Sequence, residues 1–406
     1  MSTVHEQLPA GEAALRHDRC RKLLQARLPE AGGLLLFSPV NLYYMTGTLS
    51  AGVLWLPLSG DPVLLARKAL ARARLESPLK HILPYRSYRE LADACAGAGS
   101  PLSPIIAVEK GGLSWAAAEE LQAGLQARLE DATEVLSRAR AVKTPHELIL
   151  MREAGARHRA AYEALAGLLR PGMTEREIAL IVCNEFMVRD HAMIQRSSNK
   201  LSEASPGQVS VGDNANHPDA WGGTVGGPGR HPSAPYQGSQ CVVWTRQSLL
   251  MVDLCFNYQG YHTDVSQVFW SGKAADITET ARRAHETCAA IYERAAGLLK
   301  PGNTPEQVWD ACAAMAKEAG YADSYMGLGE SRARFLGHGV GLTYDEFPVL
   351  ARRFTEPLEP GMTLAVEPKI GLPGLGMVGL ENVLEITEDG ARSITGMERG
   401  IVCIDG

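Results

Sequence analysis

Hydrophobic and polar residues alternate in two runs, LLMVDLCFNY and YHTDVSQVFW, within residues 249–270. Alternation with a period of two, interrupted by Tyr258-Gln259-Gly260, predicts two strands joined as an antiparallel hairpin. Asp253 and Asp264 are eleven positions apart, so their midpoint falls in the turn, and we expect them to face each other across the hairpin. Two carboxylates in that position repel. We therefore expect a positive charge between them, with a divalent metal ion as the obvious candidate.

The first part of the chain alternates between short apolar runs and amphipathic segments. The pattern predicts strands at 34–38, 53–58, 62–66 and 105–109, and helices at 14–28, 66–76, 86–96, 115–128 and 132–139. Strands that alternate with helices in this way predict an α/β domain, to which we assign residues 1–142. We find no catalytic set of residues in this domain.

A second domain, residues 143–406, opens with a helix start signal at Thr144-Pro145-His146-Glu147. A long helix to about Leu169 is expected, followed by a capping box of Thr174 and Glu177. Much of this segment returns 130 positions later: YE, AGLL, PG and T at 162–174 recur at 292–304. We interpret this as an internal duplication, which gives the domain a pseudo-two-fold organisation.

If the first copy ends in a hairpin with two acids, the second should also do so. The segment GMTLAVEPKIGLPGLGMVGLENVLEIT carries Glu367 and Glu381, whose midpoint is Gly374 in a glycine-rich turn. These two side chains are also predicted to face each other. Acids flanked by apolar strand residues are seldom buried unless they are paired or bind metal. His338, between glycines in FLGHGVGL, can add an imidazole to the four carboxylates.

Oxygen and nitrogen ligands without a thiolate suit Mn, Co, Fe or Zn. Two such ions would share a water, acidify it and make it a nucleophile for hydrolysis. Other catalytic signatures are absent from the sequence: it has no GxSxG, no GxxxxGK[ST] and no HExxH.

Composition narrows the function classes. The chain has 406 residues, 45% of them hydrophobic and 21% charged, with a net charge of -6. The acidic balance argues against nucleic acid as the main partner. No apolar run reaches the ~18 residues of a membrane span, and no secretory signal is expected at the N-terminus. The eight cysteines form no CxxC pair, so we expect free thiols and a cytoplasmic location.

Asp253, Asp264, His338, Glu367 and Glu381 resemble, in order and context, the five metal ligands of the pita-bread metallopeptidases. The phrases that carry the resemblance are VDLCFNYQGYHTDVSQVF, GHGVGL, GMTLAVEP and LENVLEITEDG, while LLLFSPVNLYYMTG and SRARAVKTPHELILMREA resemble the creatinase/prolidase N-terminal domain. The resemblance implies an α/β N-terminal domain, an α+β pita-bread C-terminal domain, two divalent ions with manganese favoured, and a homodimer. It also implies that Glu367 is the general base for a metal-bridging hydroxide.

The sequence departs from the family at substrate-facing positions. A family histidine is replaced by Asp345, which would favour a cationic substrate group such as an α-amine, or would pair with Arg332 or Arg334. Xaa-Pro peptidases often have arginine at the position of Gly379.

A second family histidine has no counterpart at its usual position. His217 and His231 are the candidates to replace it, and the Gly/Pro-rich run 218–235 is interpreted as an inserted loop over the active site. His262 shares strand parity with Asp264 and could also face the ligands.

The expected function is hydrolysis of short peptides by an Xaa-Pro aminopeptidase or dipeptidase. An alternative keeps the metal but acts on a small zwitterion, as a non-peptide C–N hydrolase or a lyase. The changed residues at the substrate-facing rim of the site, Asp345 and Gly379, favour this alternative. A non-catalytic binding module is a third possibility, but such a scaffold has no need to keep four buried acids together.

Overall fold

The computed structural model describes residues 7–198, 206–218 and 223–405. The chain divides into two compact units, Met1–Arg140 and Ala141–Gly406. The boundary predicted from sequence lies two residues further along. Within the described residues, no helix combines the length and apolar character needed to cross a membrane.

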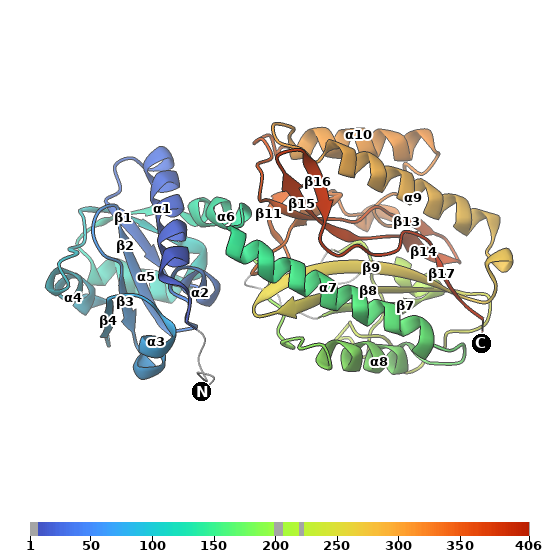
Figure 1. Ribbon diagram of the computed structural model, residues 1–406, viewed down its shortest axis with the longest axis horizontal. Coiled ribbons are helices and arrows are strands. Elements are labelled where there is room, and N and C mark those ends of the chain that lie inside the picture. Colours follow the sequence, from blue (N-terminus) through green and yellow to red (C-terminus); the bar gives the residue numbers. More distant parts are fainter. Residues whose placement is uncertain (1–6, 199–205, 219–222, 406) are drawn as a thin grey trace. The chain divides into compact units, whose positions relative to one another are not determined.

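The first unit is built on one mixed six-stranded sheet in the order β4-β3-β2-β1-β5-β6 (Figure 1). Strand β1 pairs antiparallel with β2 and parallel with β5. The strands are β1 (Gly33–Leu36), β2 (Gly52–Pro57), β3 (Val63–Ala66), β4 (His81–Pro84), β5 (Ile105–Val108) and β6 (Arg128–Asp131). The helices are α1 (Ala10–Arg27), α2 (Pro39–Thr46), α3 (Leu70–Glu76), α4 (Leu91–Gly97), α5 (Trp115–Gly124) and α6 (Thr133–Ala141).

The second unit repeats a pair of helices followed by strands. Helices α7 (Pro145–Leu168) and α8 (Glu175–Met187) correspond to α9 (Glu279–Leu298) and α10 (Pro305–Glu318). Helices α7 and α9 both end before an equivalent turn, and α8 and α10 both begin with a threonine capping box, Thr174 with Glu177 and Thr304 with Gln307. Each N-cap of this kind stabilises a helix by about 1 kcal/mol. The predicted duplication is therefore present at the level of local structure.

Strands of the second unit form two main sheets. The order in one is β17-β9-β8-β7, and in the other β11-β10-β12-β15-β16, with β13-β14 as a separate hairpin. Their bounds are β7 (Gly207–Val211), β8 (Leu249–Tyr258), β9 (Tyr261–Ser271), β10 (Gly337–Gly339), β11 (Glu346–Val349), β12 (Thr363–Val366), β13 (Lys369–Leu372), β14 (Gly376–Gly379), β15 (Asn382–Thr387), β16 (Gly390–Ser393) and β17 (Val402–Ile404).

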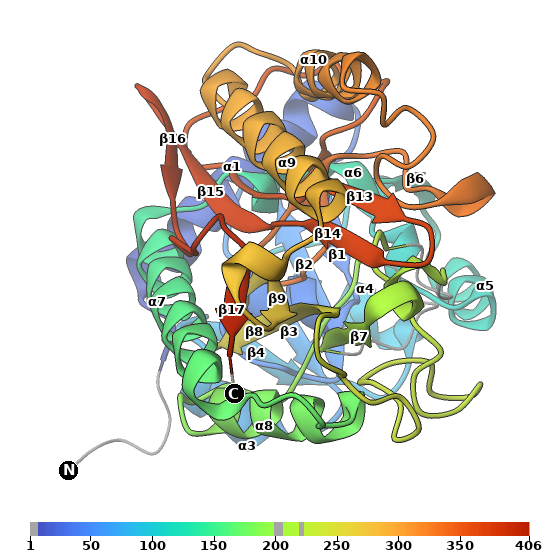
Figure 2. The same ribbon diagram turned by 90° about the vertical axis from the view of Figure 1, so that its right-hand side faces the viewer.

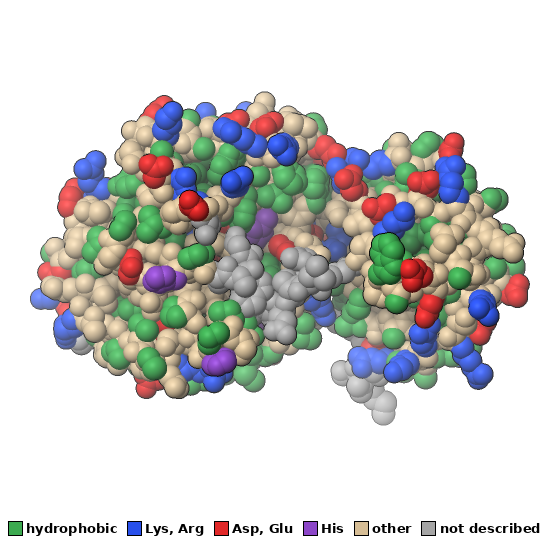
Figure 3. Space-filling model, turned by 180° about the vertical axis from the view of Figure 1, so that it is seen from behind, with side chains coloured by type: hydrophobic (Ala, Val, Ile, Leu, Met, Phe, Trp, Pro, Cys, Tyr) green, Lys and Arg blue, Asp and Glu red, His purple; other side chains and the backbone are tan. Residues whose placement is uncertain are grey.

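Figures 1 and 2 show α7 and α8 against β7–β9, and α9 and α10 on the side of β13–β16. Strands β8, β9 and β12–β15 are almost wholly buried, β9 along its entire length. The acids of the site lie on or next to these strands, and their side chains are consequently held away from bulk water. On the face shown in Figure 3, charged side chains of both signs are interspersed.

Candidate metal centre

The first aspartate pair lies on the hairpin of β8 and β9. The turn consists of Gln259 and Gly260 alone, both at positive φ (48° and 92°). Asp253 pairs with Ser266, and Asp264 pairs with Cys255. The aspartates therefore point to one face but are diagonal neighbours, and the prediction that they lie directly opposite was wrong. A two-residue turn centres the hairpin between Gln259 and Gly260, whereas the midpoint of the aspartates falls one position earlier.

The second acid pair follows the predicted register. Val366 of β12 pairs with Asn382 of β15, and Lys369 of β13 pairs with Gly379 of β14. The two numbers sum to 748 in both pairs, as they do for Glu367 and Glu381, so one register runs through these glutamates. The backbone N–H of Glu381 donates to the carbonyl of Ser266 (3.3 Å), which joins the second hairpin to the first.

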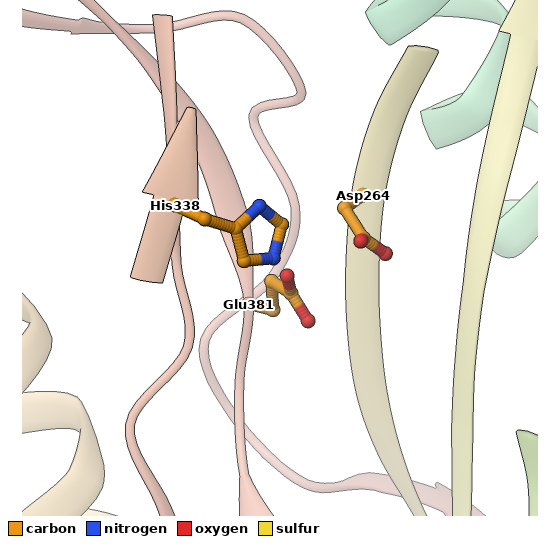
Figure 4. Close-up of side chains that lie close together, drawn as sticks. All are labelled: Asp264, His338 and Glu381. Atoms are coloured by element: carbon orange, nitrogen blue, oxygen red, sulfur yellow. The ribbon is translucent and has the colours of Figure 1, made fainter. Parts of the chain in front are cut away.

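His338 comes from β10, where it pairs with Ala365 of β12. Ligand atoms of Asp264, His338 and Glu381 lie within 4.8 Å of one another, and Figure 4 shows the three side chains converging. The His338 Nδ1 lies 3.2 Å from the Gly339 carbonyl oxygen. With Nδ1–H donating there, Nε2 keeps its lone pair for a metal ion.

The state of the acids supports a cation at this cluster. Glu381 Oε1 is buried and has no hydrogen-bond partner among the described residues. Burial, followed by the charges of Glu381 and Asp253, holds the pKa of Asp264 well above its ordinary value. A buried acceptor without a donor and a carboxylate whose charge is disfavoured are both relieved by a divalent ion. Asp264, His338 and Glu381 thus fit one metal ion.

Glu367 lies at the edge of this cluster and is held from two sides. Its Oε1 is 3.6 Å from His338 Nε2, while its Oε2 accepts hydrogen bonds from Thr224 Oγ1 (2.8 Å) and Lys369 Nζ (2.7 Å). Thr224 belongs to the Gly/Pro-rich loop predicted to cover the active site, and sequence reasoning did not single it out. The loop therefore reaches the site through a threonine hydroxyl.

Lys369 is the second residue that sequence reasoning missed. Its side chain is fully buried, and Nζ lies 2.7 Å from Glu367 Oε2, 3.0 Å from Glu381 Oε2 and 3.4 Å from Asp253 Oδ2. Burial by itself would lower the pKa of this amine, but the three carboxylates outweigh burial and hold its pKa well above the ordinary value. The pKa of Asp253 is raised to about 6. Burial is the largest cause; the Lys369 ammonium lowers this pKa, and the charge of Glu381 raises it. Asp253 thus faces an ammonium group.

The predicted rim residues lie outside this cluster of acids. His217 and His231 are exposed, and the His231 ring bonds to Ser233 in its own turn. Asp345 accepts hydrogen bonds from the Ser197 hydroxyl (2.6 Å) and the Ser198 backbone N–H. The roles of these three residues in substrate binding stay predictions.

His262 is a buried structural residue. Its Nδ1 lies 3.0 Å from the Gly341 carbonyl oxygen, and its Nε2 lies 2.9 Å from Asn257 Nδ2. Burial lowers its pKa to about 3, against a smaller opposing effect of the Gly341 carbonyl. A neutral ring with both nitrogens engaged in this way holds neighbouring segments together.

Two family models match the chain. Metallopeptidase family M24 matches residues 149–388, and the Creatinase/Prolidase N-terminal domain matches residues 16–142. The chain is 24% identical to an Xaa-Pro dipeptidase of Pyrococcus furiosus over 372 residues, which cover 91% of this chain and 94% of the relative. It is 27% identical to an Xaa-Pro dipeptidase of Lactobacillus delbrueckii subsp. lactis over 291 residues, 71% of this chain and 70% of the relative.

Solved structures show the same fold. An Xaa-Pro dipeptidase from Bacillus anthracis superposes with a TM-score of 0.80 at 20% identity, covering 96% of this chain and 99% of the other. The prolidase from Pyrococcus furiosus gives a TM-score of 0.75 at 22% identity, covering 93% and 99%. The predicted fold, a creatinase-type N-terminal domain followed by a pita-bread domain, is confirmed. Since its model matches residues 149–388 of 406, the chain belongs to metallopeptidase family M24 and is an enzyme of the hydrolase class.

Proposed function

We propose that this protein hydrolyses short peptides at an Xaa-Pro bond, as an aminopeptidase or dipeptidase, with the help of a divalent metal ion. The observation that carries the proposal is the cluster of Asp264, His338 and Glu381 where the two hairpins meet. The relatives named above, which match along most of the chain, are Xaa-Pro dipeptidases. A divalent ion at this cluster would polarise the peptide carbonyl and acidify water.

Glu367 is proposed as the general base. Its Oε2 is held by Thr224 and Lys369, so Oε1, on the His338 side, is oriented toward the cluster. We infer that Oε1 takes a proton from the attacking water as the new carbon–oxygen bond forms. The same proton then passes to the amine nitrogen as the carbon–nitrogen bond breaks. General acid–base catalysis of this kind contributes roughly 10²–10⁴-fold to rate.

The test is an assay of the metal-replete enzyme on Xaa-Pro dipeptides and tripeptides. We expect cleavage, and we expect Glu367→Gln to lower kcat by about 10²–10⁴-fold because it cannot accept the proton. Absence of cleavage of every Xaa-Pro and other short peptide, with metal bound, would refute the proposal.

The same assay tests the rim. His217→Ala, His231→Ala and Asp345→Ala are expected to alter KM more than kcat where the side chain contacts substrate. For Asp345→Ala, we expect weaker substrate binding for one of two reasons. Either the substrate α-amine loses its acceptor, or the segment of Ser197 and Ser198, which donates hydrogen bonds to Asp345, is no longer held in place. If neither histidine change alters kcat or KM, the rim assignment is wrong.

A second candidate function is favoured by Gly379. The family's arginine is missing there, and the site can instead act on a non-peptide C–N bond of a small zwitterion, as a hydrolase or lyase. Turnover of such compounds by metal-replete enzyme that leaves all short peptides intact would select this alternative. Manganese as the metal, a homodimer and a cytoplasmic location stay predictions.

A further inference from the structure

The Lys369 ammonium lies among the carboxylates that the family resemblance assigns to metal ions. An ammonium group has three N–H donors. Nζ of Lys369 has three carboxylate neighbours, Asp253, Glu367 and Glu381, at 2.7–3.4 Å. Nζ donates hydrogen bonds to Glu367 and Glu381, and Asp253 lies at ion-pair distance, so the ammonium has one carboxylate neighbour for each of its N–H groups.

The two glutamates each divide their oxygens between two directions. Glu381 Oε2 accepts from Lys369 and from Ser266 Oγ (2.7 Å), whereas Oε1 is buried without a partner. Glu367 Oε2 accepts from Lys369, whereas Oε1 lies 3.6 Å from His338 Nε2. Both carboxylates therefore bridge the ammonium and the cluster of Asp264 and His338, in the way that bridging carboxylates join two cations.

The backbone across the hairpin provides room for the lysine. Gly379 pairs directly with Lys369. A Cβ at position 379 would lie 2.8 Å from both Cα and Cγ of Lys369, with the Pro368 carbonyl oxygen closer still. A side chain at 379 is thus incompatible with the present backbone of the hairpin and with the first carbons of the Lys369 side chain. The glycine that stands in place of the family arginine therefore lies directly opposite the buried lysine.

One divalent ion beside the ammonium balances the carboxylates as well as two divalent ions would. Asp253, Asp264, Glu367 and Glu381 carry four negative charges when ionised, and one divalent ion plus the ammonium supplies three positive charges. Two divalent ions with a bridging hydroxide would also supply three. The ammonium with a single ion therefore reaches the same net charge of minus one, and a second ion would have to displace Lys369 or lie against it.

We propose that Lys369 takes the place of one metal ion, so that each chain binds a single divalent ion at Asp264, His338 and Glu381, beside Glu367. Asp253 then serves Lys369 and is not a metal ligand. The proposal concerns the same site as the proposed function and rests on it only for the expectation that the cluster binds metal.

The test counts ions on the full-length protein. Chelator-treated enzyme is titrated with Mn²⁺ by calorimetry, and bound metal is counted by mass spectrometry after dialysis. We expect one ion per wild-type chain, with the six-line electron paramagnetic resonance spectrum of an isolated Mn²⁺. Lys369→Ala should bind two ions, with the spectrum of a coupled pair, because three carboxylates lose their ammonium partner.

Two further variants make the count decisive. Asp253→Asn should still bind one ion, with its Kd changed less than about tenfold, since the ion does not contact Asp253; His338→Ala should bind none. Lys143→Ala is the matched control, because Lys143 is a second buried lysine paired with a carboxylate, Glu346 (3.1 Å). Its count should stay at one.

Two ions per wild-type chain, or a second ion lost in Asp253→Asn, would overturn the proposal. So would a folded Lys369→Ala that binds one ion only. If Lys369→Ala does not fold, the wild-type and Asp253→Asn counts decide. The ions are counted without substrate, so the count is independent of the peptide assay. One ion per chain without peptide cleavage would refute the proposed function alone. Two ions per chain with cleavage would refute this inference alone.

Discussion

Gly379→Ala should destabilise the second unit through a contact inside the site. Gly379 has φ of +154°, and its new Cβ would lie 2.8 Å from Lys369 Cα and Cγ. A residue with Cβ in a left-handed region costs about 1–2 kcal/mol, and forcing an extra carbon into a packed interior costs about 1–3 kcal/mol more. The expected loss in free energy of unfolding is therefore about 2–5 kcal/mol.

Gly374→Ala separates the two contributions. Gly374 also has positive φ (+72°), but a Cβ there would meet nothing within 4 Å. It should show only the backbone cost of about 1–2 kcal/mol. At about 2–4 °C per kcal/mol for a domain of roughly 150–250 residues, Gly379→Ala should melt about 2–12 °C below Gly374→Ala.

The assay is thermal denaturation of both variants and wild type, followed by circular dichroism at one metal concentration. Equal Tm values for the two variants would refute the reasoning, since they would show that position 379 has room beside Lys369. A lower Tm for Gly379→Ala with an altered Mn²⁺ count would further link this glycine to the lysine.

Three other perturbations test neighbouring parts of the structure. Thr224→Val should weaken Mn²⁺ binding or lower kcat by about 10–100-fold because Glu367 loses a donor, and Thr224→Ser should restore most of the loss; equal values for both variants would contradict the role of the hydroxyl. The folded-state pKa of His262, about 3, lies below the usual 6.5, so its contribution to stability is present above pH 6.5 and is lost as pH falls toward 3, at about 1.4 kcal/mol per pH unit. Urea unfolding of His262→Gln between pH 7 and 5 should show a shallower slope than wild type, while the exposed-residue control His231→Gln should not. Mn²⁺ at about 100 times its Kd should raise the free energy of unfolding by about 2.7 kcal/mol, and a similar rise in His338→Ala would place the ion elsewhere.

Local sequence signals predicted much of the fold because they act over a few residues. The helix start signal at Thr144, the capping box at Thr174 and the glycine turn around Gly374 are short-range devices, and all three are present. The acid pair Glu367 and Glu381 followed directly from the turn position. Strand existence in the first unit was predicted wherever an apolar run was continuous.

The errors arose where spacing or packing decides the outcome. The offset of Asp253 and Asp264 depends on a two-residue turn, and a sequence midpoint cannot distinguish it from a three-residue turn. Strands β4 (HILP) and β6 (RLED) were missed because their apolar runs are short, Ile82-Leu83-Pro84 in β4 and Leu129 alone in β6. Thr224 reaches Glu367 across 143 positions of sequence, and no local pattern encodes that contact.

Lys369 differs from these cases because the sequence did contain its signal. Strand periodicity puts residue 369 on the same face as Glu367, two positions earlier. The register that pairs Glu367 with Glu381 also pairs Lys369 with Gly379, where the backbone of Pro368 and Lys369 leaves no space for a Cβ. A lysine two positions after a proposed ligand, opposite a glycine, must therefore lie among the acids or leave a large gap on a buried face. The acids on the two hairpins repel one another and require positive charge between them, and a lysine on the same face predicts that the chain itself supplies part of that charge.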